Sequence, residues 1–185
     1  MVQTNTFGGI GGGEANLGYI AEFWLIDVRD VIDLAKPVLT QAGLQFPIGA
    51  VALASDAAVT HFRFGAKACT AGSDVVRSEA GIAYSVTITG SMPKPDMHLL
   101  GWLLLNARRR WLVIWRDRNG MLWLGGQPDQ GLRLDWKQVT ADRNALELSL
   151  TGLTTKPPIQ LTATTLETMF PVGEFDYSFD YSFNS

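Results

Sequence analysis

The chain has 185 residues, the length of one ordinary domain, and its 46% of hydrophobic residues can build a full core. Charged residues make up only 18% and the formal net charge is -3, so the composition gives no electrostatic reason to expect nucleic-acid binding. No apolar run reaches the roughly 18 residues of a membrane span. The single cysteine, Cys69, excludes an internal disulfide and a multi-cysteine metal site. No secretory signal is visible, so we expect synthesis in a cytoplasm.

Residues 1–18 are rich in glycine but match no phosphate-binding motif. The glycines between Phe7 and Glu14 fit neither a dinucleotide fingerprint nor a P-loop, and no strand precedes them. We therefore expect a flexible or extended N-terminal arm, with a phosphate-cradling loop as the disfavoured alternative. A single β-rich domain is expected over residues 19–170.

The first part of that domain predicts short strands separated by turns. Residues 19–26 form a strand candidate, and the following segment could be helical up to Pro37. This segment holds three acidic residues at every third position, a spacing that favours a solvated face over a cation site: Asp27, Asp30 and Asp33. Strands are expected between residues 43 and 70, whereas residues 71–74 have the composition of a loop.

The middle of the chain predicts one strand followed by one helix. Apolar and small polar side chains alternate along residues 82–89, as in a strand with one buried face. A helix is then expected over about residues 96–107, opened by the Asp96 carboxylate and buried on most of its circumference. The cations that end it complement the helix macrodipole, which we favour over a phosphate-binding patch: Arg108, Arg109 and Arg110.

The strongest local signal is a β-hairpin over residues 111–124, centred on Asn119-Gly120. An Asn-Gly pair between apolar runs predicts a two-residue type I′ turn, which would pair Arg116 with Trp123 in a cation-π contact. One face would carry Trp111, Val113, Trp115, Leu122 and Leu124, and the other Leu112, Ile114, Arg116, Met121 and Trp123. Because both faces are largely apolar, two covering layers are needed. We expect the opposing sheet on one side, and the helix or a neighbouring subunit on the other.

The C-terminal part predicts further strands and an aromatic arm. Residues 132–136 and 146–150 read as another hairpin, and residues 159–163 as a core strand or an edge. Residues 171–185 contain the unit Phe-Asp-Tyr-Ser twice, which in an extended strand gathers five aromatic side chains on one face: Phe175, Tyr177, Phe179, Tyr181 and Phe183. Such a strand invites aggregation when free. We expect it to dock on its own sheet or, by strand addition, on a neighbouring subunit.

No residue pattern composes a catalytic, cofactor or metal site. The histidines, His61 and His98, fall on different predicted elements, and neither belongs to a motif. Cys69 has no neighbouring base in sequence, and the serine-hydrolase, zinc-protease, CxxC and Walker motifs are missing. We therefore expect a non-enzymatic protein without a cofactor.

The expected fold is mainly β (α+β): an antiparallel β-sandwich or small barrel with one flanking apolar helix and extended terminal arms. Along the chain, the expected elements follow in this order: an alternating strand ending Thr87-Ile88-Thr89-Gly90, a proline-rich step, the helix, the Asn-Gly hairpin and strands ending Thr151-Gly152. Over about residues 19–163 this order resembles that of structural proteins of phage tails and contractile injection particles, namely tail-tube, distal-tail and terminator proteins. The resemblance implies a virion protein, made in the host cytoplasm, that forms rings and joins other tail or baseplate proteins. DNA would be enclosed passively in the lumen.

For that function the candidate assembly residues are Trp115, Arg116 and Trp123, together with the five aromatic residues of the C-terminal repeat. The alternative is a β-sandwich module that binds carbohydrate or peptide through exposed aromatic side chains. At least two of the six tryptophans are expected at or near the surface, as such a module requires. No sequence-specific contact with nucleic acid is expected in either case.

Overall fold

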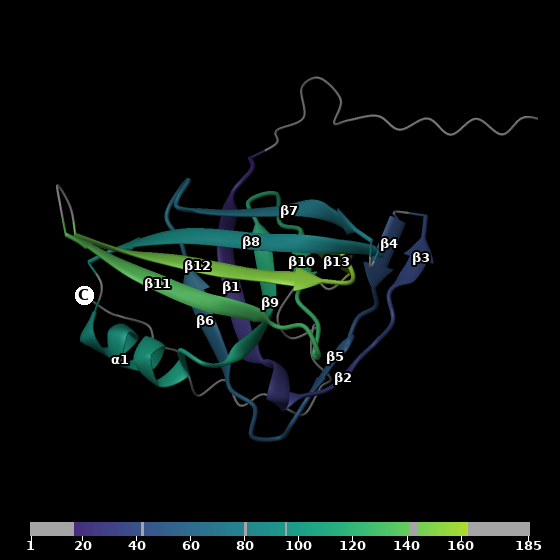
Figure 1. Ribbon diagram of the computed structural model, residues 1–185, viewed down its shortest axis with the longest axis horizontal. Coiled ribbons are helices and arrows are strands. Elements are labelled where there is room, and N and C mark those ends of the chain that lie inside the picture. The colour runs from purple at the N-terminus through teal and green to yellow at the C-terminus, as the bar shows by residue number, and fades with distance from the viewer. Residues whose placement is uncertain (1–16, 42, 80, 95, 141–143, 163–185) are drawn as a thin grey trace, which may run out of the picture.

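Strand β9 (Arg110–Asp117) joins the two layers of the protein, whose computed structural model describes residues 17–162 except 42, 80, 95 and 141–143 (Figure 1). Over most of its length β9 pairs with β1 (Ile20–Asp27) and β10 (Leu122–Gly125). Its N-terminal residues, Arg110 and Trp111, also pair with β11 (Leu132–Thr140), which begins the second layer. The hydrogen-bonded sheet therefore folds back over itself.

The remaining elements complete two sheets and a ribbon. They are the 3-10 turn η1 (Val28–Asp30), β2 (Val31–Leu34), β3 (Val38–Thr40), β4 (Gly43–Phe46), β5 (Val51–Leu53), β6 (Val59–Arg63), β7 (Cys69–Ser78), β8 (Gly81–Pro93), α1 (Met97–Asn106), β12 (Asn144–Thr154) and β13 (Ile159–Leu161). The first sheet has the strand order β6-β1-β9-β10-β13-β4-β3, and the second β11-β12-β8-β7. All pairs are antiparallel except β13 with β4, while β2 and β5 form the separate ribbon.

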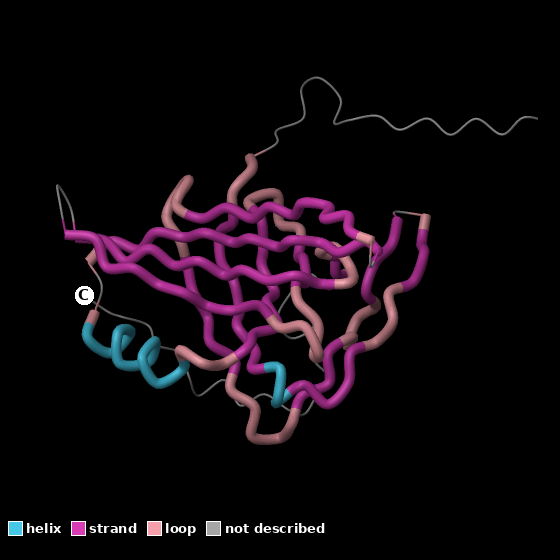
Figure 2. The backbone as a smooth tube through the Cα atoms, in the orientation of Figure 1, coloured by secondary structure: helices cyan, strands magenta, loops and turns pink. Residues whose placement is uncertain are grey.

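The predicted fold class is confirmed, since the protein is a mainly β, sandwich-like fold with one flanking helix (Figure 2). The helix begins where predicted, because the Asp96 side chain accepts a hydrogen bond from the backbone N–H of His98 at 2.5 Å. The predicted hairpin of residues 132–136 and 146–150 is also present, with Leu134 opposite Leu150.

One local prediction is wrong, and one open possibility is decided. Residues 71–74 lie inside β7 instead of a loop, because β8 offers them a continuous partner and tertiary pairing overrides their turn-like composition. Between residues 27 and 36 only η1 is helical, and the chain then enters the ribbon as β2.

The central strands of the first sheet, β1 and β9, are buried on both faces. Between the two sheets lies a cluster that includes Phe23, Leu25, Val113, Ile88, Leu148 and, from α1, Leu103. On the other face, side chains of the first sheet pack against the ribbon in a second cluster that includes Trp24, Ile26, Leu112, Ile114, Val51 and Leu53. The hairpin therefore has the two covers that its sequence demands. The second cover is the β2–β5 ribbon, and the prediction of the helix in that place is wrong because α1 packs on the side of the second sheet.

The turn of the β9–β10 hairpin is not the predicted type I′ turn. Gly120 has a φ of 85°, but Asn119 keeps a negative φ. Asp117 donates its backbone N–H to the Met121 carbonyl at 3.0 Å, and Gly120 donates to the Asp117 carbonyl at 3.1 Å. These bonds define a three-residue loop in which a type I turn is followed by a glycine in the left-handed region.

The extra loop residue shifts the strand register by one. Trp123 lies opposite Trp115, not Arg116, and Leu122 lies opposite Arg116. A one-residue shift moves every side chain of a strand to the other face, so the predicted faces of β10 are wrong. Leu122 and Leu124 belong to the ribbon-side cluster, and Trp123 packs against the cluster between the sheets. The cation-π partner of Arg116 is accordingly Trp24, at 5.6 Å from the ring centroid.

The predicted arms lie almost wholly outside the described residues. Only residues 17 and 18 of the N-terminal arm are described, and none of the C-terminal arm, residues 171–185. The described chain reaches Thr162, which binds the Phe46 carbonyl through its backbone N–H and its hydroxyl group at 3.0 and 2.8 Å.

Candidate functional site

An aromatic cleft of about 700 Å³ opens between the β9–β10 hairpin and strand β7. One wall is formed by aromatic side chains from the hairpin and from the residue before β1: Trp115, Trp123 and Tyr19. The other wall comes from the N-terminal half of β7, between Thr70 and Val75, and from Tyr84 of β8, which lies opposite Val75. Trp115 fits closely because Gly125 has no side chain; a Cβ there would lie 2.8 Å from the indole atom Cζ3.

Asp117 fixes one end of the cleft. Its Oδ1 accepts hydrogen bonds from the backbone N–H groups of Asn119 and Met121 at 2.9 and 3.0 Å. Its Oδ2 accepts the indole N–H of Trp123 at 3.2 Å. One carboxylate therefore holds both the turn and the indole. Asp117 is not among the candidate residues that the sequence indicates, although Asp and Gly at the first and fourth positions are the signature of a type I turn.

A charged cluster surrounds Glu22 on the ribbon-side face of the first sheet. Glu22 Oε1 lies 2.8 Å from Arg116 Nη1, and Oε2 lies 2.9 Å from His61 Nε2 and 3.7 Å from Arg63 Nε. The hydrogen bond with His61, aided by the positive charges of Arg116 and Arg63, outweighs burial and lowers the pKa of Glu22. The His61 ring also stacks on Trp24, with centroids 5.0 Å apart. This arrangement fastens β6, β1 and β9 together, and its residues line neither the aromatic cleft nor the smaller cavity described below.

A second carboxylate, Asp27, is buried at the end of β1. Arg29 lies 2.6 Å from its Oδ2 and Arg109 Nη1 lies 3.1 Å from the same atom. Burial raises the pKa of Asp27, but the hydrogen bonds from Arg29 and the charges of both arginines outweigh it, and the net effect is a lowered pKa. The predicted solvated face is therefore wrong for Asp27, because the two arginines cover its carboxylate.

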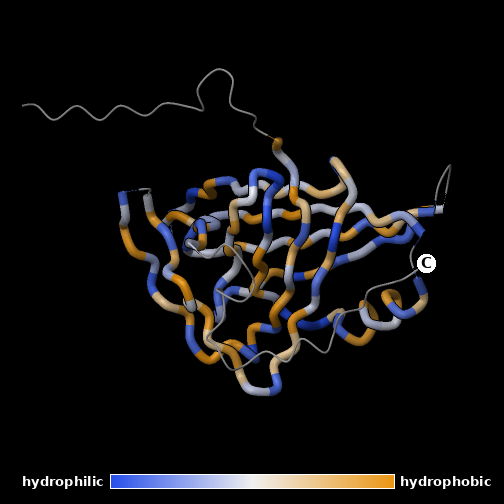
Figure 3. Tube along the Cα trace, turned by 180° about the vertical axis from the view of Figure 1, so that it is seen from behind, coloured by the Kyte–Doolittle hydropathy of each residue, from blue (hydrophilic) through white to orange (hydrophobic). Residues whose placement is uncertain are grey.

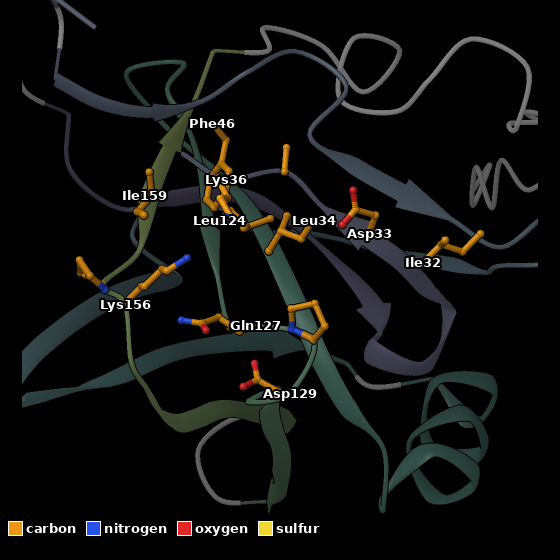
Figure 4. Close-up of a pocket in the computed structure, with 14 residues that line it drawn as sticks. Ile32, Asp33, Leu34, Lys36, Phe46, Leu124, Gln127, Asp129, Lys156 and Ile159 are labelled. Carbon is orange, nitrogen blue, oxygen red and sulfur yellow. The ribbon is translucent and has the colours of Figure 1, made fainter. Parts of the chain in front are cut away.

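A smaller cavity of about 380 Å³ lies between the ribbon and the loop after β10 (Figure 4). Its floor is apolar and includes Phe46 and Leu124. Its charged lining residues come from different segments and carry both signs: Asp33, Lys36, Asp129 and Lys156. In Figure 4, Asp33, Asp129 and Lys156 lie on different sides of the cavity, so these groups do not converge on one reacting point.

The thiol and the histidines form no reactive group with one another. Burial raises the pKa of Cys69 to about 12, so this thiol is protonated near neutral pH and is a poor nucleophile. His61 and His98 lie on separate elements, β6 and α1. Among the described residues, no three His, Cys, Asp or Glu side chains are grouped to hold a metal ion. Within the same part of the chain, no helix has the length and apolar character that a bilayer crossing requires.

Helix α1 and the β3–β4 hairpin lie at opposite ends of the sandwich (Figures 1 and 3), and both carry exposed apolar side chains. The helix patch consists of Met97, Leu104 and Leu105, which are 80%, 65% and 85% exposed. The β3–β4 patch consists of Leu39 and Leu44, which lie opposite each other on the two strands and are 80% and 48% exposed. The prediction that the helix is buried on most of its circumference is therefore wrong. The sheets cover one side of it only, and its buried residues are Leu103 and Asn106.

The predicted assembly residues are brought together only in part. Trp115 and Trp123 lie side by side in the cleft, whereas Arg116 lies on the other face of the sheet beside Glu22. The five aromatic residues from Phe175 to Phe183 fall outside the described residues. Comparisons with known proteins find no matching family model, no matching curated protein and no matching solved structure.

Proposed function

We propose that this protein is a non-enzymatic structural subunit that associates head to tail with its own copies into rings. The observation that carries the proposal is the pair of different apolar patches at opposite ends of the sandwich. Two different, opposed patches favour heterologous contacts, which close into a ring when the rotation between subunits permits. One self-complementary patch would instead favour a two-fold dimer.

The composition of the two patches supports an interface. Helix α1 contains no Asp, Glu, Lys or Arg, although more than one of its faces is exposed. Residues 38–46, which form the β3–β4 hairpin, also lack charged side chains. A solvent-facing helix normally carries charges on its outer face, and contiguous exposed apolar surface marks a site of association.

The particle that we propose is a phage tail or a related injection particle. The support is the order of strand, proline-rich step, helix, hairpin and further strands, which resembles that of tail-tube, distal-tail and terminator proteins. In such a particle the rings would contact other tail or baseplate proteins and enclose DNA passively in their lumen.

The decisive experiment changes each patch separately. Leu105→Glu places a charge in the helix patch, and Leu39→Glu places one in the β3–β4 patch. Sedimentation velocity over a range of concentrations, with electron microscopy, is expected to show rings for the unchanged chain and monomers for each variant. An equimolar mixture of the variants should form dimers and nothing larger, because one intact contact remains between unlike partners.

Thr87→Glu is the matched control, because Thr87 is an exposed residue of β8 outside both patches. It should leave ring formation unchanged. An unchanged chain that stays monomeric at every concentration would contradict the proposal. Rings that persist in Leu39→Glu would equally exclude head-to-tail contact through the β3–β4 patch.

A second candidate is a carbohydrate- or peptide-binding module, favoured by the aromatic cleft. Trp24, Trp111 and Trp115 are buried, and Trp102, Trp123 and Trp136 are half-buried, so no tryptophan forms a fully exposed platform. The cleft is therefore the surface on which this function would depend. Titration of tryptophan fluorescence with a glycan panel tests it, and the absence of any spectral shift would count against it.

A further inference from the structure

Strand β7 is an edge strand with one open side. It pairs with β8 from Cys69 to Ser78, and no described strand pairs with its other edge. In this register Ala71 lies opposite Ile88 and Ser73 opposite Val86. Ile88 and Val86 are buried between the sheets, whereas Ala71 and Ser73, on the same face, are exposed. The sandwich is therefore open beside β7, at the position where one further strand would close it.

The open side leads into the aromatic cleft. Ala71 and Ser73 have small side chains, and the facing wall carries the rings of Trp115 and Trp123. The indole N–H of Trp123 is already bonded to Asp117, so this ring offers the cleft mainly apolar surface. A space with one small-residue wall and one aromatic wall suits large, flat side chains that enter from the edge of β7.

We propose that residues 175–183 of this same chain fill the cleft as an added strand paired with β7. The sequence of this segment alternates aromatic residues with Asp and Ser. Side chains of a strand alternate between its two faces, so one strand can direct its aromatic face into the cleft and its polar face to solvent. The nine-residue segment also matches the ten residues of β7 in length.

The position of Thr162 favours docking on the same molecule. Leu161 lies opposite Leu122, next to the hairpin loop whose Asp117 and Asn119 line the cleft. Residues 163–174 can extend to about 40 Å, and packed sheets lie only about 10 Å apart. A tether that spans its sites gives an effective concentration of about millimolar. Docking on the same chain should therefore prevail over docking on a second copy. This proposal does not depend on ring formation.

Hydrogen exchange of the full-length chain tests the proposal. The variant combines Tyr177→Ser, Phe179→Ser and Tyr181→Ser, which removes the central aromatic side chains. We expect the outward backbone amides of β7 to exchange at least about tenfold faster in this variant, because they lose their hydrogen-bond partners. The control combines Asp176→Asn and Asp180→Asn. It should retain slow exchange, since these residues lie on the other face of the proposed strand.

The same measurement in the Leu105→Glu background separates this proposal from the proposed function, because that variant is designed to be monomeric. Slow exchange of β7 that is independent of protein concentration supports docking on the same chain. Slow exchange that appears only as concentration rises would show that a second copy supplies the strand, and the proposal would be wrong. Equal exchange in the aromatic variant and the unchanged chain would also overturn it.

Discussion

At the Glu22 carboxylate, side chains from three strands meet. Glu22 belongs to β1, His61 and Arg63 to β6, and Arg116 to β9. These contacts lower the pKa of Glu22 below its ordinary value of 4.5. A carboxyl group whose pKa is lower in the folded chain stabilises the fold while it is ionised. That stabilisation is complete above about pH 4.5 and is lost as the pH falls through the folded-state pKa.

Replacement of Glu22 by Gln should lower the free energy of unfolding by about 1–2 kcal/mol at neutral pH, because a charged hydrogen-bond acceptor is lost. The difference between the variant and the unchanged chain should shrink in acid, where Glu22 is protonated in both the folded and unfolded chains. Urea denaturation over a range of pH measures this difference.

The matched control is Asp135→Asn, which removes the exposed ion pair with Arg133. An exposed pair of this kind contributes under about 1 kcal/mol. An effect of Glu22→Gln that stays constant down to the lowest pH would show that the carboxylate charge does not stabilise the fold.

At the scale of single elements, the sequence predicts what local signals determine. Alternation along Leu132 and Leu134 predicts β11, and the Asp96 carboxylate predicts the start of α1. Prediction fails where the structure of a segment depends on contacts with a segment distant in sequence. Residues 71–74 have turn composition, yet they pair with β8 along its length. The second cover of the hairpin comes from Val51 and Leu53, which no local pattern connects to it.

The sequence predicts the candidate site, like the fold, only where local signals determine it. Trp115 and Trp123 are singled out by the sequence, but whether they share a face depends on one residue of register. The register of the hairpin is set by the conformation of Asn119 and by the Asp117 side chain, which favour a three-residue loop over a two-residue turn. The β7 wall of the cleft could not be predicted, because its residues have the composition of a turn although they form a strand.

The hydrogen bonds of Asp117 and the positive φ of Gly120 lead to a testable prediction about the hairpin turn. Asp117→Ala removes the acceptor of three hydrogen bonds and should lower the free energy of unfolding by about 2–3 kcal/mol. Gly120→Ala should cost about 1 kcal/mol, because a residue with a Cβ is strained at a φ of 85°. Guanidinium denaturation midpoints, with the slope unchanged, measure both effects.

Met121→Ala is the control for the turn, because Met121 is exposed and directly follows the loop. Its effect should stay within about 0.5 kcal/mol. If Asp117→Ala were no more destabilising than this control, the three bonds of the carboxylate would not hold the hairpin.

Across the whole molecule, β1 and β9 contribute to both hydrophobic clusters. Phe23 and Val113 face the second sheet, while Trp24 and Leu112 face the ribbon. Side chains of these two central strands therefore connect the ribbon to the sandwich. Loss of packing on one face should weaken strands that the other face also requires.

This coupling predicts that the described residues unfold as one unit. Leu53→Ala in the ribbon-side cluster and Leu148→Ala in the cluster between the sheets should each cost about 2–5 kcal/mol, since both side chains are fully or nearly buried. Both variants should unfold in a single transition that fluorescence and circular dichroism report at the same denaturant concentration. A Leu53→Ala variant that loses tryptophan signal first, while the β-sheet signal persists, would show that the ribbon opens separately from the sandwich. The two faces of the first sheet would then be stabilised independently, despite the strands that they share.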